Sequence, residues 1–236
     1  MMPAVDCHTH ILPGIDDGST SLDESIAMLQ QEAKQGIRHV IATPHFYANH
    51  DTPERFLKRR AQAYRKLRET LEKHEGLPQI HIGAEVYFFY GMSDCDALPE
   101  MAVDGKKYIL IEMPHAPWAN SMYQELENIY TKRGITPMIA HIDRYIGPLQ
   151  THKIPERLSE LPVVVQANTS FFTKKMTQIM ALKMLREGKI QLLGSDCHNM
   201  QMRKPDMLPA MELIKDRLGP EAIEYIRHYE RDVLQE

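Results

Sequence analysis

The chain has 236 residues, enough for one domain with a full hydrophobic core, and 43% of them are hydrophobic and 25% charged. A net charge of −4 offers no general attraction to nucleic acid, and no stretch approaches the roughly 18 apolar residues of a membrane helix. The amino terminus lacks the basic and apolar regions of a signal peptide, and three widely spaced cysteines indicate reduced thiols. We therefore expect a single cytoplasmic domain over residues 1–236, without membrane insertion and without a nucleic-acid partner.

Apolar runs rich in β-branched residues alternate with segments of helical periodicity along the chain. These patterns predict, in chain order, a strand over 4–7, a helix over 22–33, a strand over 38–43, a helix over 53–75, strands over 80–84 and 108–111, a helix over 120–132, strands over 137–140 and 163–167, a helix over 175–187, a strand over 190–194, and helices over 207–217 and from 220 onward. Gly36 ends the first helix, and Thr52 and Pro53 cap and open the second.

This alternation of strands and helices indicates an α/β fold with a mainly parallel sheet. Seven strands favour a closed or nearly closed barrel over an open doubly wound sheet. The chain contains neither a Gly-x-Gly-x-x-Gly fingerprint nor a Walker phosphate loop, which weakens the nucleotide-binding alternatives.

Histidines and carboxylates occur where the predicted strands end. Six of the seven strands run into such a residue at their carboxyl ends, and the sixth strand is the exception. In α/β barrels this end carries the active site, because the loops after the strands converge around the barrel mouth. The side chains concerned are His8, His10, His45, Glu85, Glu112, His141, Asp196 and His198.

The spacing and chemistry of these residues indicate a site for divalent metal ions. His8 and His10 are two residues apart, so an extended backbone points both side chains to one face. Glu85 and Glu112 lie so close to buried apolar runs that they would be costly without a cation to neutralise them. Imidazole and carboxylate ligands without thiolate suit Mn²⁺, Fe²⁺ or Zn²⁺ better than Ca²⁺ or copper.

Each of these residues has a simpler explanation when it is considered alone. A single histidine at a strand end is more often a hydrogen-bonded structural residue than a metal ligand, and a single glutamate there is often solvated. The coincidence across six strands is what favours one metal site. The structural interpretation is kept for the other histidines, which are His39, His50, His74, His81, His115, His152 and His228.

Two arginines follow the proposed ligands on loops that leave the same end of the predicted barrel. Arg144 lies three residues after His141, and Arg203 lies five residues after His198. A guanidinium is a planar fork that suits phosphate oxygens, although the spacing alone supports an ordinary surface arginine equally well.

Five segments carry a resemblance to known proteins. Residues 6–18 read DCHTHILPGIDDG, and later segments read ATPH (42–45), GAE (83–85), IAHIDRY (139–145) and GSDCHN (194–199). In this order, over nearly the whole chain, they resemble the motifs of the polymerase and histidinol phosphatase (PHP) superfamily. The resemblance is closest to the manganese-dependent protein-tyrosine phosphatases of bacterial capsule and exopolysaccharide operons, particularly in the Asp-Asp-Gly after the first histidine pair.

The resemblance implies a distorted, TIM-like β/α barrel of seven strands with a site for two or three divalent metals, Mn²⁺ being favoured and Fe²⁺ or Zn²⁺ the alternatives. By analogy, one metal takes His8, His10, Glu85 and Asp196, a second shares Glu85 and adds Glu112 and His141, and a third takes Asp17, His45 and His198. The adjacent Asp16 competes with Asp17, and periodicity does not choose between them. Arg144 and Arg203 would hold the substrate phosphate.

The activity implied is hydrolysis of phosphotyrosine by a metal-activated hydroxide, on the tail of a bacterial tyrosine kinase that controls polysaccharide export. The alternatives are a small-molecule phosphatase of the same superfamily, such as histidinol-phosphate phosphatase, and a non-catalytic metal-binding module. A nuclease role is less attractive because the chain is acidic. Some relatives form oligomers, and the sequence does not decide whether this chain is a homo-oligomer.

Cys197 and Arg203 have the Cys-x₅-Arg spacing of the unrelated cysteine-dependent tyrosine phosphatases. The chemistry of those enzymes needs a cradle of backbone amides and a thiolate with a depressed pKa. The five intervening residues contain no glycine, and Cys197 alternates between Asp196 and His198, so its side chain should point away from the metals. We therefore predict that Cys197 is not a nucleophile.

Overall fold

Nine strand segments form the centre of the computed structural model, which describes residues 5–146 and 154–235. The strands are β1 (Val5–Thr9), β2 (His39–Ala42), β3 (His45–Phe46), β4 (Gln79–Ile82), β5 (Glu85–Tyr87), β6 (Tyr108–Glu112), β7 (Thr136–Ile139), β8 (Val164–Asn168) and β9 (Leu192–Gly194). The α-helices are α1 (Leu22–Lys34), α2 (Pro53–Leu71), α3 (Leu98–Met101), α4 (Asn120–Arg133), α5 (Ile154–Leu158), α6 (Thr169–Thr173), α7 (Gln178–Arg186), α8 (Met207–Leu218) and α9 (Pro220–Leu234). Short 3₁₀ turns are η1 (Met92–Asp94), η2 (Val103–Gly105) and η3 (Ile142–Arg144).

The strands pair in parallel, and their pairing runs around a ring. One sheet has the order β1-β2-β4, and the other has the order β3-β5-β6-β7-β8-β9. The two sheets are joined where β2 continues into β3 and β4 into β5, and a parallel bridge between Thr9 and Cys197 joins their other edges. The predicted α/β barrel is confirmed, in a distorted form.

The described residues form nine strand segments where the sequence predicts seven strands, because two short segments, β3 and β5, follow the predicted strands over 38–43 and 80–84. Residues 43–44 separate β2 from β3, and residues 83–84 separate β4 from β5. A proline has no N–H to give to a strand ladder, which explains the break at Pro44. Each interruption stands directly before a residue of the predicted metal site, namely His45 and Glu85.

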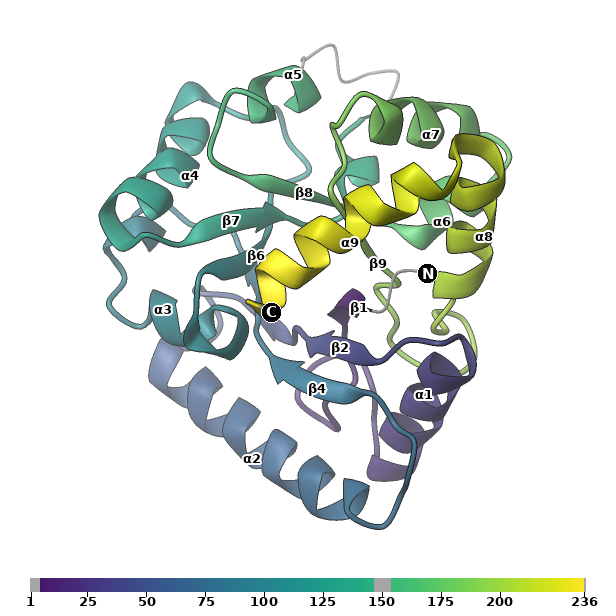
Figure 1. Ribbon diagram of the computed structural model, residues 1–236. Helices are drawn as coiled ribbons and strands as arrows, with labels where there is room; N and C mark the ends of the chain where they lie inside the picture. Colours follow the sequence, from purple (N-terminus) through teal and green to yellow (C-terminus); the bar gives the residue numbers. More distant parts are fainter. Residues whose placement is uncertain (1–4, 147–153, 236) are drawn as a thin grey trace.

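Helices enclose the ring of strands, and α9 lies across one of its ends (Figure 1). A large apolar core holds the strands and helices together. A second, smaller core contains Val5, Tyr108 and Val164, the first residues of β1, β6 and β8, together with Val233 and Leu234 of α9. α9 therefore closes the amino-terminal end of the barrel, and the carboxyl ends of the strands lie on the opposite side.

The six helices predicted from the sequence are present, with ends that differ by a few residues. α2 ends at Leu71 and not near residue 75, and α7 begins at Gln178 and not at residue 175. The short helices α3, α5 and α6 have four or five residues each, too few for a periodic pattern to predict them. Ala4, which opens the first predicted strand, and His152 lie outside the described residues.

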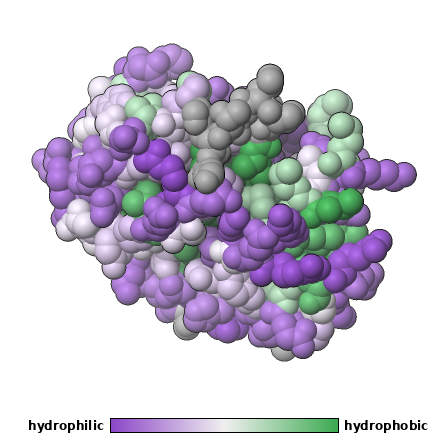
Figure 2. Space-filling model, turned by 90° about the horizontal axis from the view of Figure 1, so that it is seen from above, coloured by the Kyte–Doolittle hydropathy of each residue, from purple (hydrophilic) through white to green (hydrophobic). Residues whose placement is uncertain are grey.

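Figure 2, which views the molecule from above, shows a mostly polar surface with an apolar area on the right. Met176, Ile179 and Met180 are exposed large apolar residues of α7 and the turn before it. In residues 5–146 and 154–235, no helix is both long enough and apolar enough to cross a membrane.

Gly194, the last residue of β9, makes a close contact inside the barrel that generates a test of the fold. A Cβ atom on Gly194 would lie 2.6 Å from Cβ of His8 and 2.8 Å from Nε2 of Gln166. We predict that Gly194→Ala lowers the free energy of unfolding by about 1–3 kcal/mol in urea denaturation, because the added methyl group forces neighbouring strands to shift. Gly83→Ala is the matched control, since its nearest heavy atom is 3.5 Å away. Equal stability of the two variants would contradict the prediction.

Candidate metal centre

The imidazole and carboxylate groups of the predicted site meet in one buried cluster at the carboxyl ends of the strands. The Nε2 atoms of His8 and His10 lie 3.1 Å apart, and Oε2 of Glu85 lies 3.1 and 3.3 Å from them. The same oxygen lies 3.0 Å from Nδ1 of His45. Oδ1 of Asp196 lies 3.6 Å from each of the first two nitrogens. The four residues assigned to one metal are thus brought together, with His45 beside them.

A β-bulge in β1 contains His8 and directly precedes His10. Asp6 pairs with Val40 and Thr9 pairs with Ala42, so β1 has one residue more than β2 between the two pairs. Such an extra residue turns the following side chains relative to the regular alternation, and bulges are frequent beside active sites for this reason. The bulge is therefore one of the features that aim His8 at the cluster.

Hydrogen bonds on the outer side of the rings decide which nitrogen faces the cluster. Nδ1 of His10 lies 2.8 Å from Oδ2 of Asp16, and Nδ1 of His8 lies 3.3 Å from Oε1 of Gln166. Both partners are acceptor oxygens, so each Nδ1 donates a hydrogen bond, and in the neutral form of each ring Nε2 carries the lone pair. Two lone pairs that face each other at 3.1 Å repel unless a proton or a metal ion lies between them. Metal-binding histidines are commonly oriented by such outer partners.

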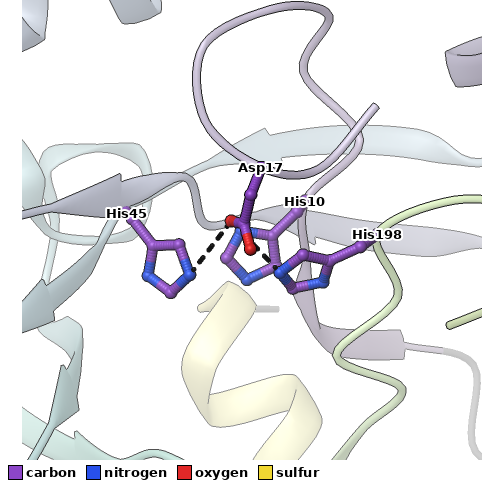
Figure 3. A group of neighbouring side chains, drawn as sticks. All are labelled: His10, Asp17, His45 and His198. Carbon is purple, nitrogen blue, oxygen red and sulfur yellow. Dashed lines mark ion pairs between the residues drawn. The ribbon is translucent and has the colours of Figure 1, made fainter. Parts of the chain in front are cut away.

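Asp17, His45 and His198 form a second part of the cluster with His10 (Figure 3). Oδ1 of Asp17 lies 3.5 Å from Nε2 of His45 and 3.5 Å from Nε2 of His198. Nδ1 of His198 lies 3.0 Å from the backbone carbonyl oxygen of Asp196, to which it donates, so Nε2 faces the cluster. These atoms are close enough to share one ion.

Asp16 has a different position from its neighbour Asp17. Its carboxylate accepts hydrogen bonds from His10 and from the backbone N–H groups of Gly18 and His45. These bonds orient His10 and fix the loop after β1. Of the two aspartates that the sequence left open, Asp17 is the one that faces His45 and His198.

Glu112 and His141 complete the cluster on the side of β6 and β7. Nε2 of His141 lies 3.0 Å from Oε1 of Glu85 and 3.4 Å from Oε1 of Glu112. Glu85 therefore offers one oxygen to His141 and the other to His8 and His10. His141 and Asp196 have φ values of 34° and 55°, in the left-handed region that non-glycine residues seldom occupy. Strained backbone of this kind is frequent at functional sites.

The donor atoms fit divalent metal ions. Oε2 of Glu85 and Nε2 of His198 are buried and have no hydrogen-bond partner among the described residues. Nitrogen and carboxylate oxygen donors suit Mn²⁺, Fe²⁺ or Zn²⁺. Three groups within the cluster offer ligand atoms that all lie within 4.8 Å of one another, and they are His8, His10 and Glu85; His10, Asp17, His45 and His198; and His45, Glu85 and Glu112. These groups overlap with the ligand sets that the resemblance implies. His10 and His45 each belong to two of the three groups, whereas the resemblance assigns each of them to one metal.

The ionisation of the cluster also calls for a cation. Burial alone would raise the pKa of Glu85, but the charge of His8 and close contacts with the other histidines hold it well below its usual range. Burial would lower the pKa of His10, yet its hydrogen bond with Asp16 and its contact with the carboxylate of Glu85 raise it to about 10. The pKa of His198 is lowered to about 4 by burial and by the charges of its cationic neighbours. The negative carboxylates thus favour the protonated, positively charged form of the neighbouring histidines. A bound metal ion would supply the same positive charge.

Arg144 and Arg203 lie at the edge of the cluster, and both are partly exposed. Nη2 of Arg144 donates to Oδ2 of Asp196 at 2.7 Å, and Nη1 donates to Oε1 of Glu112 at 3.2 Å. Nη2 of Arg203 lies 2.6 Å from Oδ1 of Asp196. Both guanidinium groups line a solvent-open cavity of about 540 Å³. An anion that entered this cavity would meet two arginines.

Sequence reasoning missed the contribution of the sixth predicted strand, which is β8. Oε1 of Gln166 accepts from the backbone N–H of His141 at 2.7 Å and lies beside Nδ1 of His8. Nδ2 of Asn168 donates to Oδ2 of Asp196 at 3.0 Å, and Gln166 donates to Asn168. The two amides lie two residues apart at the end of an apolar run, and this spacing places both side chains on one face of the strand. A search for carboxylates and imidazoles alone does not include them.

Cys197 faces away from the metal cluster, as predicted. Its side chain is fully buried and lies with Asp6 and Glu32 behind β1. Burial raises the pKa of this thiol well above its usual value, and the charges of Asp6 and Glu32 add to the effect. A buried, protonated thiol is a poor nucleophile.

Of the histidines interpreted as structural, those that the structure describes lie outside the three ligand groups. His81 is held between His39 and Asp104, with nitrogen–nitrogen and nitrogen–oxygen distances of 3.1 and 2.7 Å. His50 lines a different cavity, which opens beside His45 and Asp17.

Comparison with known proteins gives a consistent set of relatives. The chain is 29% identical over 230 residues to tyrosine-protein phosphatase CpsB of Streptococcus pneumoniae, covering 91% of each chain. It is 28% identical over 229 residues to tyrosine-protein phosphatase YwqE of Bacillus subtilis, covering 92% of this chain and 86% of the relative.

Solved structures agree on the fold. A structure from a study of YwqE of Bacillus subtilis and CpsB of Streptococcus pneumoniae, described as unique metal-dependent tyrosine phosphatases, matches with a TM-score of 0.85 at 23% identity, over 98% of this chain and 94% of that one. Histidinol phosphate phosphatase of Lactococcus lactis, solved with zinc, matches with a TM-score of 0.59 at 14% identity, over 93% of each chain. The sequence model of the family described as "Capsular polysaccharide synthesis, CpsB/CapC" matches residues 4–234, and the chain belongs to this CpsB/CapC family.

Proposed function

We propose that this chain is a metal-dependent protein-tyrosine phosphatase that works with two or three divalent ions, Mn²⁺ being favoured and Fe²⁺ or Zn²⁺ the alternatives. The observation that carries the proposal is the convergence of His8, His10, His45 and His141 on the buried carboxylate of Glu85. The relatives named as tyrosine-protein phosphatases extend over almost the whole chain, and they support the choice of reaction.

The proposed ligand sets follow the distances in the cluster. One ion takes His8, His10, Glu85 and Asp196; a second takes Glu85, Glu112 and His141; and a third takes Asp17, His45 and His198. The 3.0–3.6 Å separations of the donor atoms around Glu85 support the first two sets. The position of Asp17 between His45 and His198 supports the third.

The residues around the cluster would divide the reaction among them. Divalent metals held there would lower the pKa of a coordinated water and neutralise charge on the phosphate oxygens. Arg144 and Arg203 would bind the phosphate oxygens that face the cavity, in place of part of their present contacts with Asp196. A phenol has a pKa of roughly 10, so the departing tyrosine needs little help from a general acid. No protein nucleophile is required.

The natural substrate we propose is a phosphotyrosine segment, with the tail of a bacterial tyrosine kinase controlling capsule or exopolysaccharide synthesis as the first candidate. The description of the family as one of capsular polysaccharide synthesis supports this choice. The cavity beside Arg144 and Arg203 is open to solvent, which suits a side chain presented on a peptide. Small-molecule phosphate esters and a purely metal-binding role remain as the alternatives for the test that follows.

We predict that kcat/KM is much higher for a phosphotyrosine peptide than for a phosphoserine peptide or histidinol phosphate. Chelator should abolish the activity and added Mn²⁺ should restore it, because the proposed nucleophile is a hydroxide that forms only on a bound metal. A phosphate-release assay on the three substrates, with metal analysis of the same protein, measures both. Preference for histidinol phosphate would favour the small-molecule alternative. Protein without bound metal that does not hydrolyse p-nitrophenyl phosphate in Mn²⁺ would not be a phosphatase of this kind.

A pair of variants separates the metal mechanism from the cysteine mechanism. We predict that Cys197→Ser keeps most of the wild-type kcat, since the thiol is buried and faces away from the cluster. Glu112→Gln should lower kcat by about 100-fold or more, because even the outer partners of metal ligands commonly contribute 10–100-fold. Steady-state kinetics on p-nitrophenyl phosphate, with circular dichroism to check folding, provides the comparison. A folded but inactive Cys197→Ser protein would refute the proposed mechanism.

A further inference from the structure

Two cavities flank the metal cluster, and their cationic side chains are arranged differently. The first has a volume of about 550 Å³ and opens beside Asp17 and His45. Its two arginines, Arg55 and Arg59, both contact Asp51, at 3.4 and 2.7 Å. Asp16 and Asp17 line this cavity as well, so its carboxylates outnumber its arginines and compensate their charge.

The second cavity, of about 540 Å³, is the one that contains Arg144 and Arg203. It is formed by the loops after β7, β8 and β9, and its lining also includes Lys174 and Lys204. Both lysines are exposed, and neither has an ion-pair partner within 4 Å among the residues that the structure describes. This side of the cluster thus offers two uncompensated cations next to the two arginines.

The acidic residues of the second cavity already have polar partners. Asp196 contacts both arginines, Asp143 accepts from the backbone N–H of Asn168, and Asp206 accepts from the hydroxyl of Thr169. Lys174 is close enough to Asp206 for its charge to act on that carboxylate, but the two form no ion pair within 4 Å. An anion from outside would therefore meet little competition for Lys174 and Lys204.

We propose that Lys174 and Lys204 form a second anion subsite, which binds an acidic side chain on the residues that flank the phosphotyrosine. The proposal rests on the proposed function, since it places the phosphotyrosine phosphate at Arg144 and Arg203 of the same cavity. Ser170 lines this cavity too, and its hydroxyl group can donate a hydrogen bond to the same anion. Aspartate, glutamate or a second phosphotyrosine would supply the negative charge.

The two arginines are proposed to bind the phosphate and the two lysines the flanking acid, because their side chains differ in chemistry. Arginine presents a planar fork that binds two phosphate oxygens at once, whereas lysine is a flexible point charge that accepts anions in many orientations. A fixed phosphate must be held in one geometry for reaction, but a flanking acid only has to be attracted. The subsite would therefore select acidic segments without requiring one sequence.

The experiment compares phosphotyrosine peptides of one sequence that carry glutamate, a second phosphotyrosine, glutamine or lysine beside the phosphotyrosine. In low salt, we expect kcat/KM for the glutamate peptide to exceed that for the glutamine peptide by about threefold to tenfold, as for two exposed ion pairs, and to fall with added salt. In Lys174→Gln/Lys204→Gln this ratio should approach one. The relative rates of the glutamate and diphosphorylated peptides identify which acid the subsite favours.

Lys175→Gln is the matched control, because Lys175 is an exposed neighbour that does not line the cavity. It should keep the wild-type ratio. Binding of the same peptides with an uncleavable phosphonate, measured on the Mn²⁺-treated protein, gives a readout that does not depend on turnover. Turnover without preference for acidic peptides, or a preference unchanged in the double variant, would refute the proposed subsite. Either result would still be consistent with the proposed phosphatase function. Lysine-dependent binding of the acidic phosphonate peptide without any turnover would support the subsite and refute the proposed function.

Discussion

Four imidazole rings surround the buried carboxylate of Glu85, and the arrangement of the strands brings these rings together. Nitrogen atoms of His8, His10 and His45 lie within 3.3 Å of Oε2 of Glu85, and His141 lies 3.0 Å from Oε1. A carboxylate in such a position is costly unless positive charge compensates it. Its neutralisation therefore constrains the ends of β1, β3, β5 and β7 at the same time.

The irregular backbone of the barrel is concentrated around this carboxylate. The bulge in β1 and the interruptions at residues 43–44 and 83–84 all stand next to residues of the cluster. His141 and Asp196 adopt left-handed backbone conformations that regular strands do not contain. Hydrogen bonds that Asp16 and Gln166 accept and that Asn168 donates hold the resulting geometry in place. The fold thus departs from a regular barrel where a compact set of donor atoms requires it.

The α/β class could be predicted because apolar strand-like runs alternate with helical segments. The polar cluster could be predicted because imidazoles and carboxylates follow several of these runs. The choice between Asp16 and Asp17 could not, since it depends on how the loop after β1 turns. Gln166 and Asn168 look like ordinary polar residues of a strand until their distances to neighbouring strands are known. The strand count differed because β3 and β5 have only two and three residues. The extent of the domain over 1–236 and a cytoplasmic location stay predictions.

X-ray diffraction from crystals of the Mn²⁺-treated protein, recorded at the manganese absorption edge, would locate bound ions directly. We predict one anomalous peak in contact with Glu85 beside His8 and His10, and a second in contact with Glu85 beside Glu112 and His141. The third site would give a peak beside Asp17. Crystals of active protein that contain manganese elsewhere and show no peak next to Glu85 would contradict the central claim.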